Sequence, residues 1–291
     1  MPIFNFVIST DNTCDFPENF YEQHGVPCLH IDYTIDEICY DGSIKGLSPK
    51  VFYDKIRAGS MPITQQANPE KSREFFEKIL KDGKDILHIA FSSGLSGTYQ
   101  SNRMAAQELA EEYPERKIVI LDSLCASAGE GLLVFEALKR RNEGMSMEEV
   151  TAWVENNKLR LVHDVVADDL FHLQRGGRVS KTAAIFGSAL GIKPQIHVDN
   201  EGHLIPFGKI RGKKAGLLSM ADRLAKNLEP TDTIFVSHSD SLEDAEALCQ
   251  MIKERTGHDK FQISYIGPTI GAHTGVGTVA LFYFAKDRTP A

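Results

Sequence analysis

The sequence predicts an α/β protein with an N-terminal parallel-sheet (Rossmann-like) domain, residues 1–160, and a C-terminal α/β domain with a mixed sheet, residues 161–291. In the first half, short apolar runs alternate with amphipathic helical patterns, which is the order of a parallel sheet with crossover helices. In the second half, Asn200-Glu201-Gly202 between two apolar runs indicates a hairpin and therefore antiparallel pairing. The last strand is able to pack back near the boundary between the two domains.

In the first half, strands are expected where apolar residues run almost without interruption, as in strands buried on both faces. These runs are 4–8, 26–33, 85–91 and 117–121. Helices are expected over 48–57, 70–81, 99–112 and 147–161, and another begins near 126–131. The first of these helices is the best marked, because Ser48 is a favoured capping residue and Pro49 suits the first helical position. The stretch 59–69 has little periodicity and is predicted to be a loop.

In the second half, strands are expected at 161–166 and 233–238, the hairpin at 193–198 and 203–207, and helices at 169–175, 217–228 and 242–255. The apolar stretch 183–192 contains interleaved small residues. It suits either a buried helix or a wall that leaves space for a ligand tail, and periodicity does not separate the two. The closing segment places His273 in a glycine-rich loop before an apolar strand.

Composition excludes several classes of protein. The 291 residues are 42% hydrophobic, enough for a sizeable core, and the formal charge of -8 argues against nucleic acid or an anionic membrane surface as the main partner. The chain has neither a signal-peptide pattern nor an apolar run near the ~20 residues of a membrane helix. The five cysteines are scattered without metal-binding spacing. We therefore expect a cytoplasmic protein with reduced thiols, no metal and no cofactor.

The most informative stretch is 91–100, Phe-Ser-Ser-Gly-Leu-Ser-Gly-Thr-Tyr-Gln, which we call the serine turn. It joins the carboxyl end of a predicted strand to the amino end of a predicted helix, where free N–H groups and the helix dipole favour an anion. The turn lacks the lysine of a Walker loop, the glycine pattern of a dinucleotide site and the second glycine of a lipase-type elbow. It therefore suits a single carboxylate or phosphoryl group, unless its serines only cap the helix.

Two other predicted strands also end in polar residues, Ser9-Thr10-Asp11 and Asp122-Ser123. The carboxyl ends of parallel strands share one edge of a sheet, where ligands bind. Ordinary turns with capping residues are the alternative. A run of four cations between Lys209 and Lys214 is either a solvated basic face or a surface for docking a partner.

Several motifs together resemble the DegV family in content and order. They are Ser9-Thr10-Asp11, Thr64-Gln65-Gln66, the serine turn, Asp122-Ser123, Arg175-Gly176-Gly177-Arg178, Gly208-Lys209-Ile210-Arg211 and His273-Thr274-Gly275-Val276-Gly277. The resemblance covers essentially the whole chain. The sequence departs from the usual family pattern at Gln65, where the family has serine, and at Val276, where it has proline; the first departure bears on headgroup contacts or pocket width.

The resemblance implies a bacterial lipid-binding protein that is not itself an enzyme and has no catalytic residues. It implies that one long-chain fatty acid, such as palmitate, stearate or oleate, is held with its carboxylate at the domain interface and its tail buried. The implied carboxylate ligands are Thr64, Ser96, Gly97 and His273, and nearby residues are Ser93, Gln65, Arg175 and Arg178. Which of the two arginines faces the headgroup stays open.

Some family members are subunits of fatty acid kinases that present the acid to a separate ATP-dependent kinase subunit. Lys209 and Arg211 match the region associated with docking that partner. A competing hypothesis is a serine hydrolase, with Ser96 as nucleophile, His273 as base and Asp11 or Asp122 as the orienting acid, although the elbow spacing is wrong for it. A kinase in its own right would need a nucleotide loop or clustered metal carboxylates, and the sequence shows neither.

Overall fold

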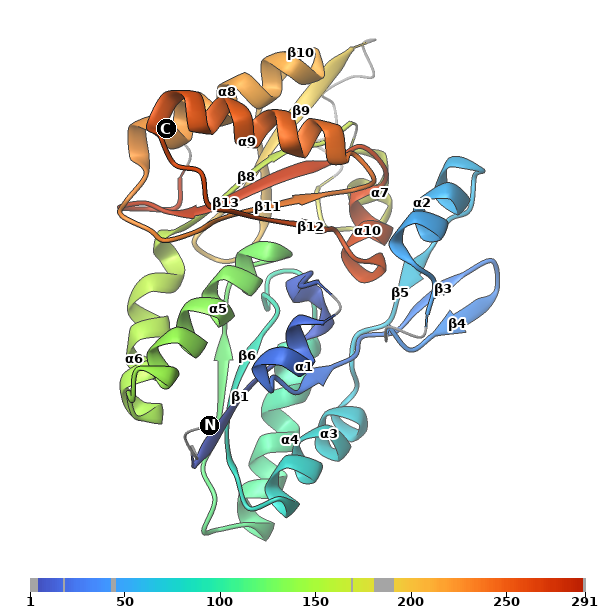
Figure 1. Ribbon diagram of the computed structural model, residues 1–291. Coiled ribbons are helices and arrows are strands. Elements are labelled where there is room, and N and C mark those ends of the chain that lie inside the picture. The colour runs from blue at the N-terminus through green and yellow to red at the C-terminus, as the bar shows by residue number, and fades with distance from the viewer. Residues whose placement is uncertain (1–4, 18, 43–45, 169, 181–190, 290–291) are drawn as a thin grey trace.

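The computed structural model describes residues 5–17, 19–42, 46–168, 170–180 and 191–289. Two sheets with their helices lie one above the other in Figure 1, and a smaller three-stranded sheet projects from one side. The strands of the four-stranded sheet come from residues 6–122 and those of the six-stranded sheet from residues 161–284. The fold is α/β with a parallel and a mixed sheet, as predicted.

The first sheet has the order β2-β1-β6-β7, and all neighbouring strands are parallel. Its strands are β1 (Phe6–Asp11), β2 (Cys28–Leu29), β6 (Asp85–Ala90) and β7 (Ile118–Asp122). The helices around it are α1 (Phe20–His24), α3 (Pro69–Lys81), α4 (Thr98–Glu112), α5 (Ala128–Asn142) and α6 (Met147–Asn157), with short 3-10 turns η1 (Asn12–Cys14) and η2 (Lys158–Arg160).

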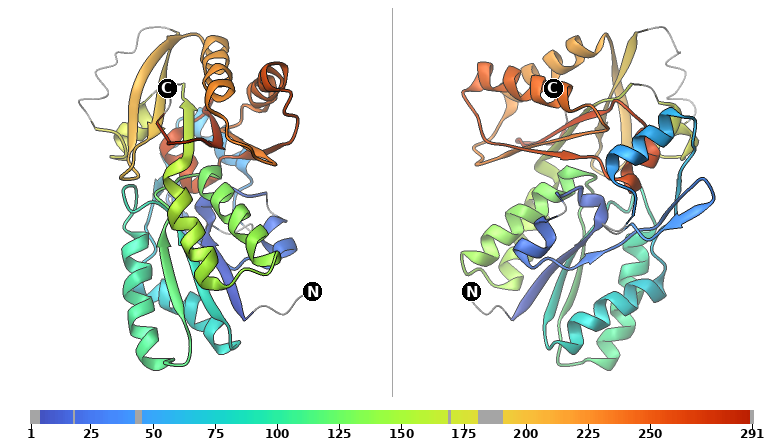
Figure 2. Two further views of the ribbon diagram at one scale, coloured as in Figure 1. Left: turned by 90° about the vertical axis from the view of Figure 1, so that its left-hand side faces the viewer. Right: turned by 45° about the vertical axis from the view of Figure 1, so that its right-hand side comes forward.

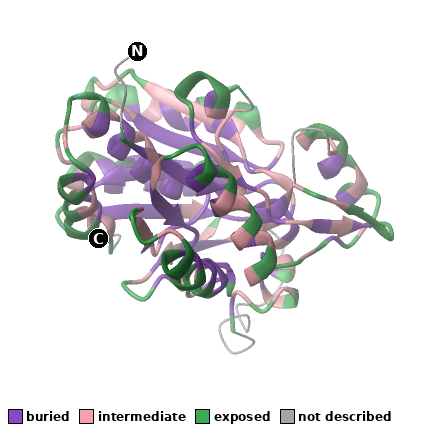
Figure 3. Ribbon diagram, turned by 90° about the horizontal axis from the view of Figure 1, so that it is seen from below, coloured by how far each residue is buried: buried purple, intermediate pink, exposed green. Residues whose placement is uncertain are grey.

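Alternation along β6 assigns the helices to two faces of the first sheet. Ile86 packs with Phe76 of α3 and Leu109 of α4, whereas Leu87 and Ile89 face the cluster that contains α5 and α6. Successive side chains of a strand point to opposite faces, so apolar residues at every position require a helix layer on each side. The two central strands β1 and β6 are accordingly buried, the edge strand β7 is mostly half-buried, and the outer helix surfaces are exposed (Figure 3).

The second sheet has the order β10-β9-β8-β13-β11-β12. Its strands are β8 (Leu161–Val166), β9 (Ile192–Val198), β10 (Leu204–Arg211), β11 (Ile234–His238), β12 (Phe261–Tyr265) and β13 (Val279–Phe284). Only the β11–β12 pair is parallel within this described sheet. The helices α8 (Lys213–Asn227) and α9 (Leu242–Thr256) cover its outer face, and α7 (Phe171–Arg175) and α10 (Pro268–Thr274) lie near one end (Figure 1).

Helix α5 lies between the two sheets. Its Leu132 and Leu133 share one apolar cluster with Ile8 of the first sheet and with Phe282 and Phe284 of β13. Gly129 is required at this contact, because a Cβ there would lie 2.3 Å from Nε2 of His163. The last strand thus packs toward the first sheet through α5. Helix α5 is buried on almost every side because it has a sheet on each side.

The third sheet, in the order β4-β3-β5, forms with α2 a small lobe inserted between β2 and α3 (Figure 2). Its elements are β3 (Tyr33–Ile35), β4 (Ile38–Tyr40), α2 (Pro49–Arg57) and β5 (Ile63–Thr64). Ser48 caps α2 through a bond from the backbone N–H of Val51, as predicted. We call residues 33–64 the small lobe.

The element predictions were wrong at several places. The strand expected over 26–33 is split between β2 and β3, and the expected loop 59–69 contains β5. His273 lies in α10, which begins at Pro268, and not in a loop; a proline at the first helical position favours this start. Helix α6 ends at Asn157, and β12 was missed. The prediction for 183–192 falls largely outside the described residues.

Candidate functional site

The serine turn joins β6 to α4 and rests against the hairpin of the second sheet. The hydroxyl of Ser92 donates to the carbonyl oxygen of Gly202 at 2.8 Å, and a Cβ at Gly94 would lie 2.8 Å from the carbonyl oxygen of Glu201. Ser96 accepts a hydrogen bond from the backbone N–H of Thr98 at 3.2 Å, so it does satisfy one free donor of the helix end. The turn is therefore held between the two sheets.

A cavity lies beside this turn, between the two sheets and the small lobe. Its outline takes in about 880 Å³ of space outside atoms, part of which is open to solvent. Its apolar lining residues are Ile31, Phe91, Leu95, Ala126, Val165, Ala167, Leu173, Ile196, Val198, Leu204, Ile266, Ile270, Ala280 and Phe282. Its polar lining residues are Thr13, Thr64, Gln66, Ser96, Ser127, His163, Arg178, Thr269, His273, Thr274 and Thr278.

Most of the inner hydroxyls of this cavity are already used by the protein. The bonds run from Thr13 to Glu130, from Ser127 to Asp15, from Thr269 to the carbonyl of Ile31 and from Thr278 to the carbonyl of Thr274. His163 accepts from the backbone N–H of Ala126, and burial lowers its pKa well below the usual value. These groups direct their donors away from the cavity, so its inner wall is apolar in practice.

Two hydroxyls at the other end of the cavity are arranged differently. Oγ1 of Thr64 lies 2.9 Å from Nε2 of His273, and Oγ of Ser96 lies 3.0 Å from Oγ1 of Thr98. Both Thr64 and Ser96 are half-buried, and Gln66 and Gly97 beside them are exposed. This end of the cavity thus combines two hydroxyls with access to the surface.

His273 is a neutral ring at physiological pH. Burial, together with the nearby charges of Arg178 and Arg175, lowers its pKa to about 3. Nδ1 is buried against Gly176 and has no hydrogen-bond partner among the described residues. Placing the single ring proton on Nε2 lets it donate to Thr64, because the other tautomer would bury an N–H without an acceptor. The Thr64 hydroxyl then keeps its own proton for another acceptor.

The two candidate arginines lie in different places. Arg178 lines the cavity, where Nε donates to the carbonyl oxygen of Leu95 at 3.0 Å and Nη1 to that of Gly176 at 2.7 Å. Arg175 is exposed and donates to the carbonyl oxygen of Pro62 at 2.7 Å. Burial lowers the pKa of Arg178, but a guanidinium stays charged at neutral pH.

Arg178 is the one formally charged side chain among the described lining residues, and no carboxylate lines the cavity beside it. Its hydrogen bonds to described residues go to backbone carbonyls, and none of the ion pairs in the described chain includes it. The turn itself has no cation; the structure brings one to it from the segment after α7. The open end of the cavity is therefore suited to an anion.

Other predicted residues lie outside the cavity lining. Ser93 is exposed and its backbone N–H donates to Asp122 at 3.1 Å, and Gln65 is exposed with its N–H bonded to the carbonyl oxygen of Asp32. Sequence reasoning missed Gln66, whose side chain packs so closely on Gly97 that a Cβ there would lie 2.2 Å from Oε1. Gln66 lies just beyond the two-residue strand β5, so no alternation in the sequence marked its side chain as part of the site.

Lys209 and Arg211 are exposed on the edge strand β10. A register irregularity over 206–208 changes which face their side chains take. Leu204 pairs with Val198 of β9 before the irregularity, and after it Lys209 and Arg211 pair with Pro194 and Ile192. Alternate residues of β9 lie on one face, and paired residues of an antiparallel ladder share a face, so both cations share the face of Leu204. The bulge therefore places both cations on the sheet face that carries the cavity.

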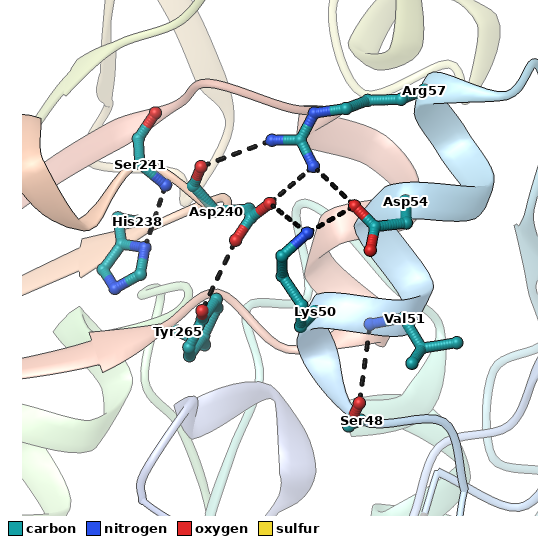
Figure 4. A network of polar contacts seen from close by, with 9 residues as sticks. All are labelled: Ser48, Lys50, Val51, Asp54, Arg57, His238, Asp240, Ser241 and Tyr265. Carbon is teal, nitrogen blue, oxygen red and sulfur yellow. Dashed lines mark hydrogen bonds and ion pairs between the residues drawn. The ribbon is translucent and has the colours of Figure 1, made fainter.

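The small lobe that supplies Thr64 is fastened to the second sheet (Figure 4). Lys50 and Arg57 of α2 form ion pairs with Asp240, in the loop after β11. Tyr53 donates to the carbonyl oxygen of Ile266 at 2.7 Å and is fully buried. Exposed ion pairs contribute only ~0–1 kcal/mol each, so the buried aromatic contact does most to fix the lobe.

The arrangement does not form a hydrolase triad. Asp11 is buried and accepts from backbone N–H groups of η1 and of the residue after β6, and Asp122 accepts from the serine turn and its own loop. The Nδ1 atom of His273, where an orienting acid belongs, faces Gly176. Within the described residues no hydrogen bond joins Ser96 to His273. Nothing here supports Ser96 as a nucleophile.

The described residues contain neither a metal-binding cluster nor a membrane-spanning helix. No group of three or more His, Cys, Asp or Glu side chains in that part of the chain is arranged to hold a metal ion. None of its helices has the length and apolar character needed to span a bilayer.

Comparisons with known proteins place these features in context. A protein-family model described as "Uncharacterised protein, DegV family" matches residues 5–286 of this chain. A DegV domain-containing protein of Clostridium perfringens is 43% identical over 288 residues, which cover 98% of this chain and 99% of that protein. The solved structure of Bacillus subtilis DegV, described as a fatty acid binding protein, is 28% identical with a TM-score of 0.83 over 98% of this chain and 100% of that one.

A Thermus thermophilus DegV family protein, whose structure is described by its fatty acid binding, is 27% identical with a TM-score of 0.84, covering 97% of this chain and 100% of that one. The family match and the relatives agree over nearly the full length. This chain belongs to the DegV family.

Proposed function

We propose that this chain binds one long-chain fatty acid, such as palmitate, stearate or oleate, between two domains formed by residues 1–160 and 161–291. Its carboxylate accepts hydrogen bonds from Thr64, Ser96 and the backbone at Gly97, with His273 behind Thr64. Its tail fills the apolar part of the cavity. No cofactor or metal takes part, and the chain itself performs no reaction.

The charge pattern of the cavity carries this proposal. Its walls are apolar, its inner hydroxyls are used internally, and its open end holds two hydroxyls with a proton to donate beside Arg178. An acid with a single negative charge and a long apolar tail complements all three features. The fatty acid binding described for the Bacillus subtilis and Thermus thermophilus proteins supports the same ligand class.

The two ends of the ligand have different tasks. Burying about fifteen methylene groups at ~0.8 kcal/mol each contributes on the order of 12 kcal/mol before the costs of binding. A hydrogen bond to a charged group contributes only about 1.5–3 kcal/mol. The tail therefore supplies most of the affinity, and the hydroxyls and Arg178 fix which end faces out.

We further propose that the exposed headgroup end serves to present the acid to a separate ATP-dependent fatty acid kinase subunit. Gln66 and Gly97 at this end are exposed, so a partner has access to the carboxylate. Lys209 and Arg211 are exposed on the same sheet face as the cavity, where they provide cations for an acidic partner surface.

The decisive measurement is mass spectrometry of the lipid released by denaturing the purified native protein, with quantification against protein concentration. We expect close to one fatty acid per chain in the wild type. A protein that carries no acid, and that takes up none of palmitate, stearate or oleate when these are added, would refute the proposal. A neutral lipid as the main ligand would refute the assigned role of Arg178.

The presentation role has its own test, which is acyl phosphate formation with a purified ATP-dependent fatty acid kinase subunit. Thr64→Ala and Ser96→Ala are expected to reduce turnover more than they reduce bound lipid. Lys209→Glu and Arg211→Glu should raise the concentration of protein needed for half-maximal turnover, whereas the exposed Lys214→Glu serves as a matched control. Equal effects of all three charge reversals would remove the docking assignment.

A further inference from the structure

The Ser96 hydroxyl has two hydrogen-bonding neighbours, and one residue, Thr98, supplies both. The backbone N–H of Thr98 donates to Oγ of Ser96 at 3.2 Å, and Oγ1 of Thr98 lies 3.0 Å from the same oxygen. Thr98 is the first residue of α4 and is fully buried, whereas Ser96 is half-buried at the cavity. One buried side chain thus contacts a hydroxyl group of the cavity lining.

Counting donors and acceptors sets the direction of the contact between the two hydroxyls. Oγ1 of Thr98 accepts a hydrogen bond from the backbone N–H of Ala67 at 3.2 Å. Its own proton needs an acceptor, and in the described part of the chain the oxygen within reach is Oγ of Ser96. The opposite direction would leave a buried O–H of Thr98 without an acceptor, which is unfavourable. Thr98 therefore donates to Ser96.

This direction decides what the Ser96 hydroxyl does. Its oxygen then accepts from both the N–H and the O–H of Thr98, which uses the two lone pairs of a serine oxygen. Its proton has to point elsewhere, and the open side is the cavity that Ser96 lines. A serine held in this way is a donor only, which suits a carboxylate and not a cation.

Thr98 also connects the two segments that carry the headgroup hydroxyls. Ala67, which donates to it, comes three residues after Thr64 on the chain that leaves β5. The same hydroxyl group therefore links the end of the small lobe to the serine turn. Its two hydrogen bonds tie the segment that follows Thr64 to Ser96, and the Thr64 and Ser96 hydroxyls come from different elements.

We propose that Thr98 is a positioning residue of the binding site: it orients the Ser96 hydroxyl as a donor toward the ligand carboxylate and holds the Thr64 segment beside it. The inference rests on the fatty acid binding proposed above and adds a residue that does not itself contact the ligand. Hydrogen bonds donated to a carboxylate favour its charged form, so they lower its pKa.

The test is a pH titration of protein-bound [1-¹³C]palmitate followed by the carboxyl ¹³C shift, in the wild type, Thr98→Val and Thr98→Ser. Valine keeps the shape but has no hydroxyl, whereas serine keeps the hydroxyl. We expect the bound carboxyl to titrate at a higher pH in Thr98→Val than in the wild type, with affinity roughly three- to tenfold weaker. Thr98→Ser should restore both.

A second comparison separates positioning from a general structural effect. In the Ser96→Ala background, Thr98→Val should change the carboxyl titration less than it does in the wild-type background. The part of its effect that runs through Ser96 is already lost there, and only its hold on the Thr64 segment remains. If Thr98→Val does not fold, Thr98→Ala is measured by the same criteria. The inference is overturned if the bound carboxyl titrates at the same pH in Thr98→Val as in the wild type. It is also overturned if Thr98→Ser shifts this titration as much as Thr98→Val does. A wild type without bound palmitate refutes fatty acid binding instead, and the inference with it.

Discussion

Replacing Arg178 with glutamine tests the charge argument most directly. Arg178 is half-buried at the headgroup end, and its described hydrogen bonds go to the carbonyl oxygens of Leu95 and Gly176. Glutamine is polar and shorter, and it removes the charge without leaving a carboxylate unpaired, because no described acid is bonded to Arg178. The expected loss is that of one charge-assisted interaction.

The size of the loss follows from typical magnitudes. A charge-assisted hydrogen bond contributes about 1.5–3 kcal/mol, and each 1.4 kcal/mol is tenfold in affinity, so palmitate should bind about 10- to 150-fold more weakly to Arg178→Gln. The tail contribution of order 12 kcal/mol is unchanged, so the site should still fill at higher ligand concentration. Displacement of a fluorescent fatty acid by palmitate measures the dissociation constants of palmitate for the wild type and for Arg178→Gln.

Two controls make this result specific. Hexadecanol has the same tail without charge, and its affinity should change less than about threefold in Arg178→Gln. Arg175→Gln removes an exposed guanidinium bonded to the carbonyl of Pro62, and palmitate affinity should stay near wild type. The reasoning is refuted if palmitate and hexadecanol weaken equally in Arg178→Gln, or if Arg175→Gln weakens palmitate by as much.

Three further predictions concern other residues. Burial raises the pKa of Asp15 to about 7. The contribution of this carboxyl to the free energy of unfolding is therefore fully present below about pH 4, and on the order of 4 kcal/mol is lost as the pH rises through 7. In Asp15→Asn, the free energy of unfolding in urea should depend less on pH over that range. Gly97→Ala would displace Gln66 and should weaken palmitate binding severalfold by calorimetry, unlike Gly144→Ala. Arg223→Leu leaves the buried carboxylate of Asp164 unpaired and should lower the free energy of unfolding by about 3–5 kcal/mol in the same urea assay. The dependence of that free energy on urea concentration should stay as in the wild type.

Sequence periodicity predicted most helices and strands because their apolar residues face a sheet or helix layer. Helix α2 was placed within a residue, since Ser48 and Pro49 mark its start. The hairpin of β9 and β10 was predicted from its turn residues. In contrast, β5 has two residues and β2 has two, too short for any alternation to emerge from the surrounding loop. Their strand character comes from pairing with distant segments.

The site was predicted in its parts more than in its arrangement. Local pattern predicts an anion site at the serine turn, but the turn alone has no cation. Nothing in its sequence indicates that Arg178 donates to the carbonyl oxygen of Leu95 within it. The distinction between Arg175 and Arg178 likewise depends on how the segment after α7 turns at Gly176 and Gly177. Glycine at 177 has a φ of +77°, which redirects the chain between the two arginines.

The hydroxyl directions show why a list of site residues is insufficient to define this site. The cavity contains many hydroxyls, yet those of its inner part donate to the protein, while Thr64 and Ser96 each receive a hydrogen bond that leaves their own proton available. His273 does this for Thr64, because its Nδ1 has no partner and Nε2 carries the proton. Two donors from separate elements are therefore preset beside one guanidinium. In the proposed complex, burial alone retains the tail, while these donors keep the headgroup oriented toward the exposed end.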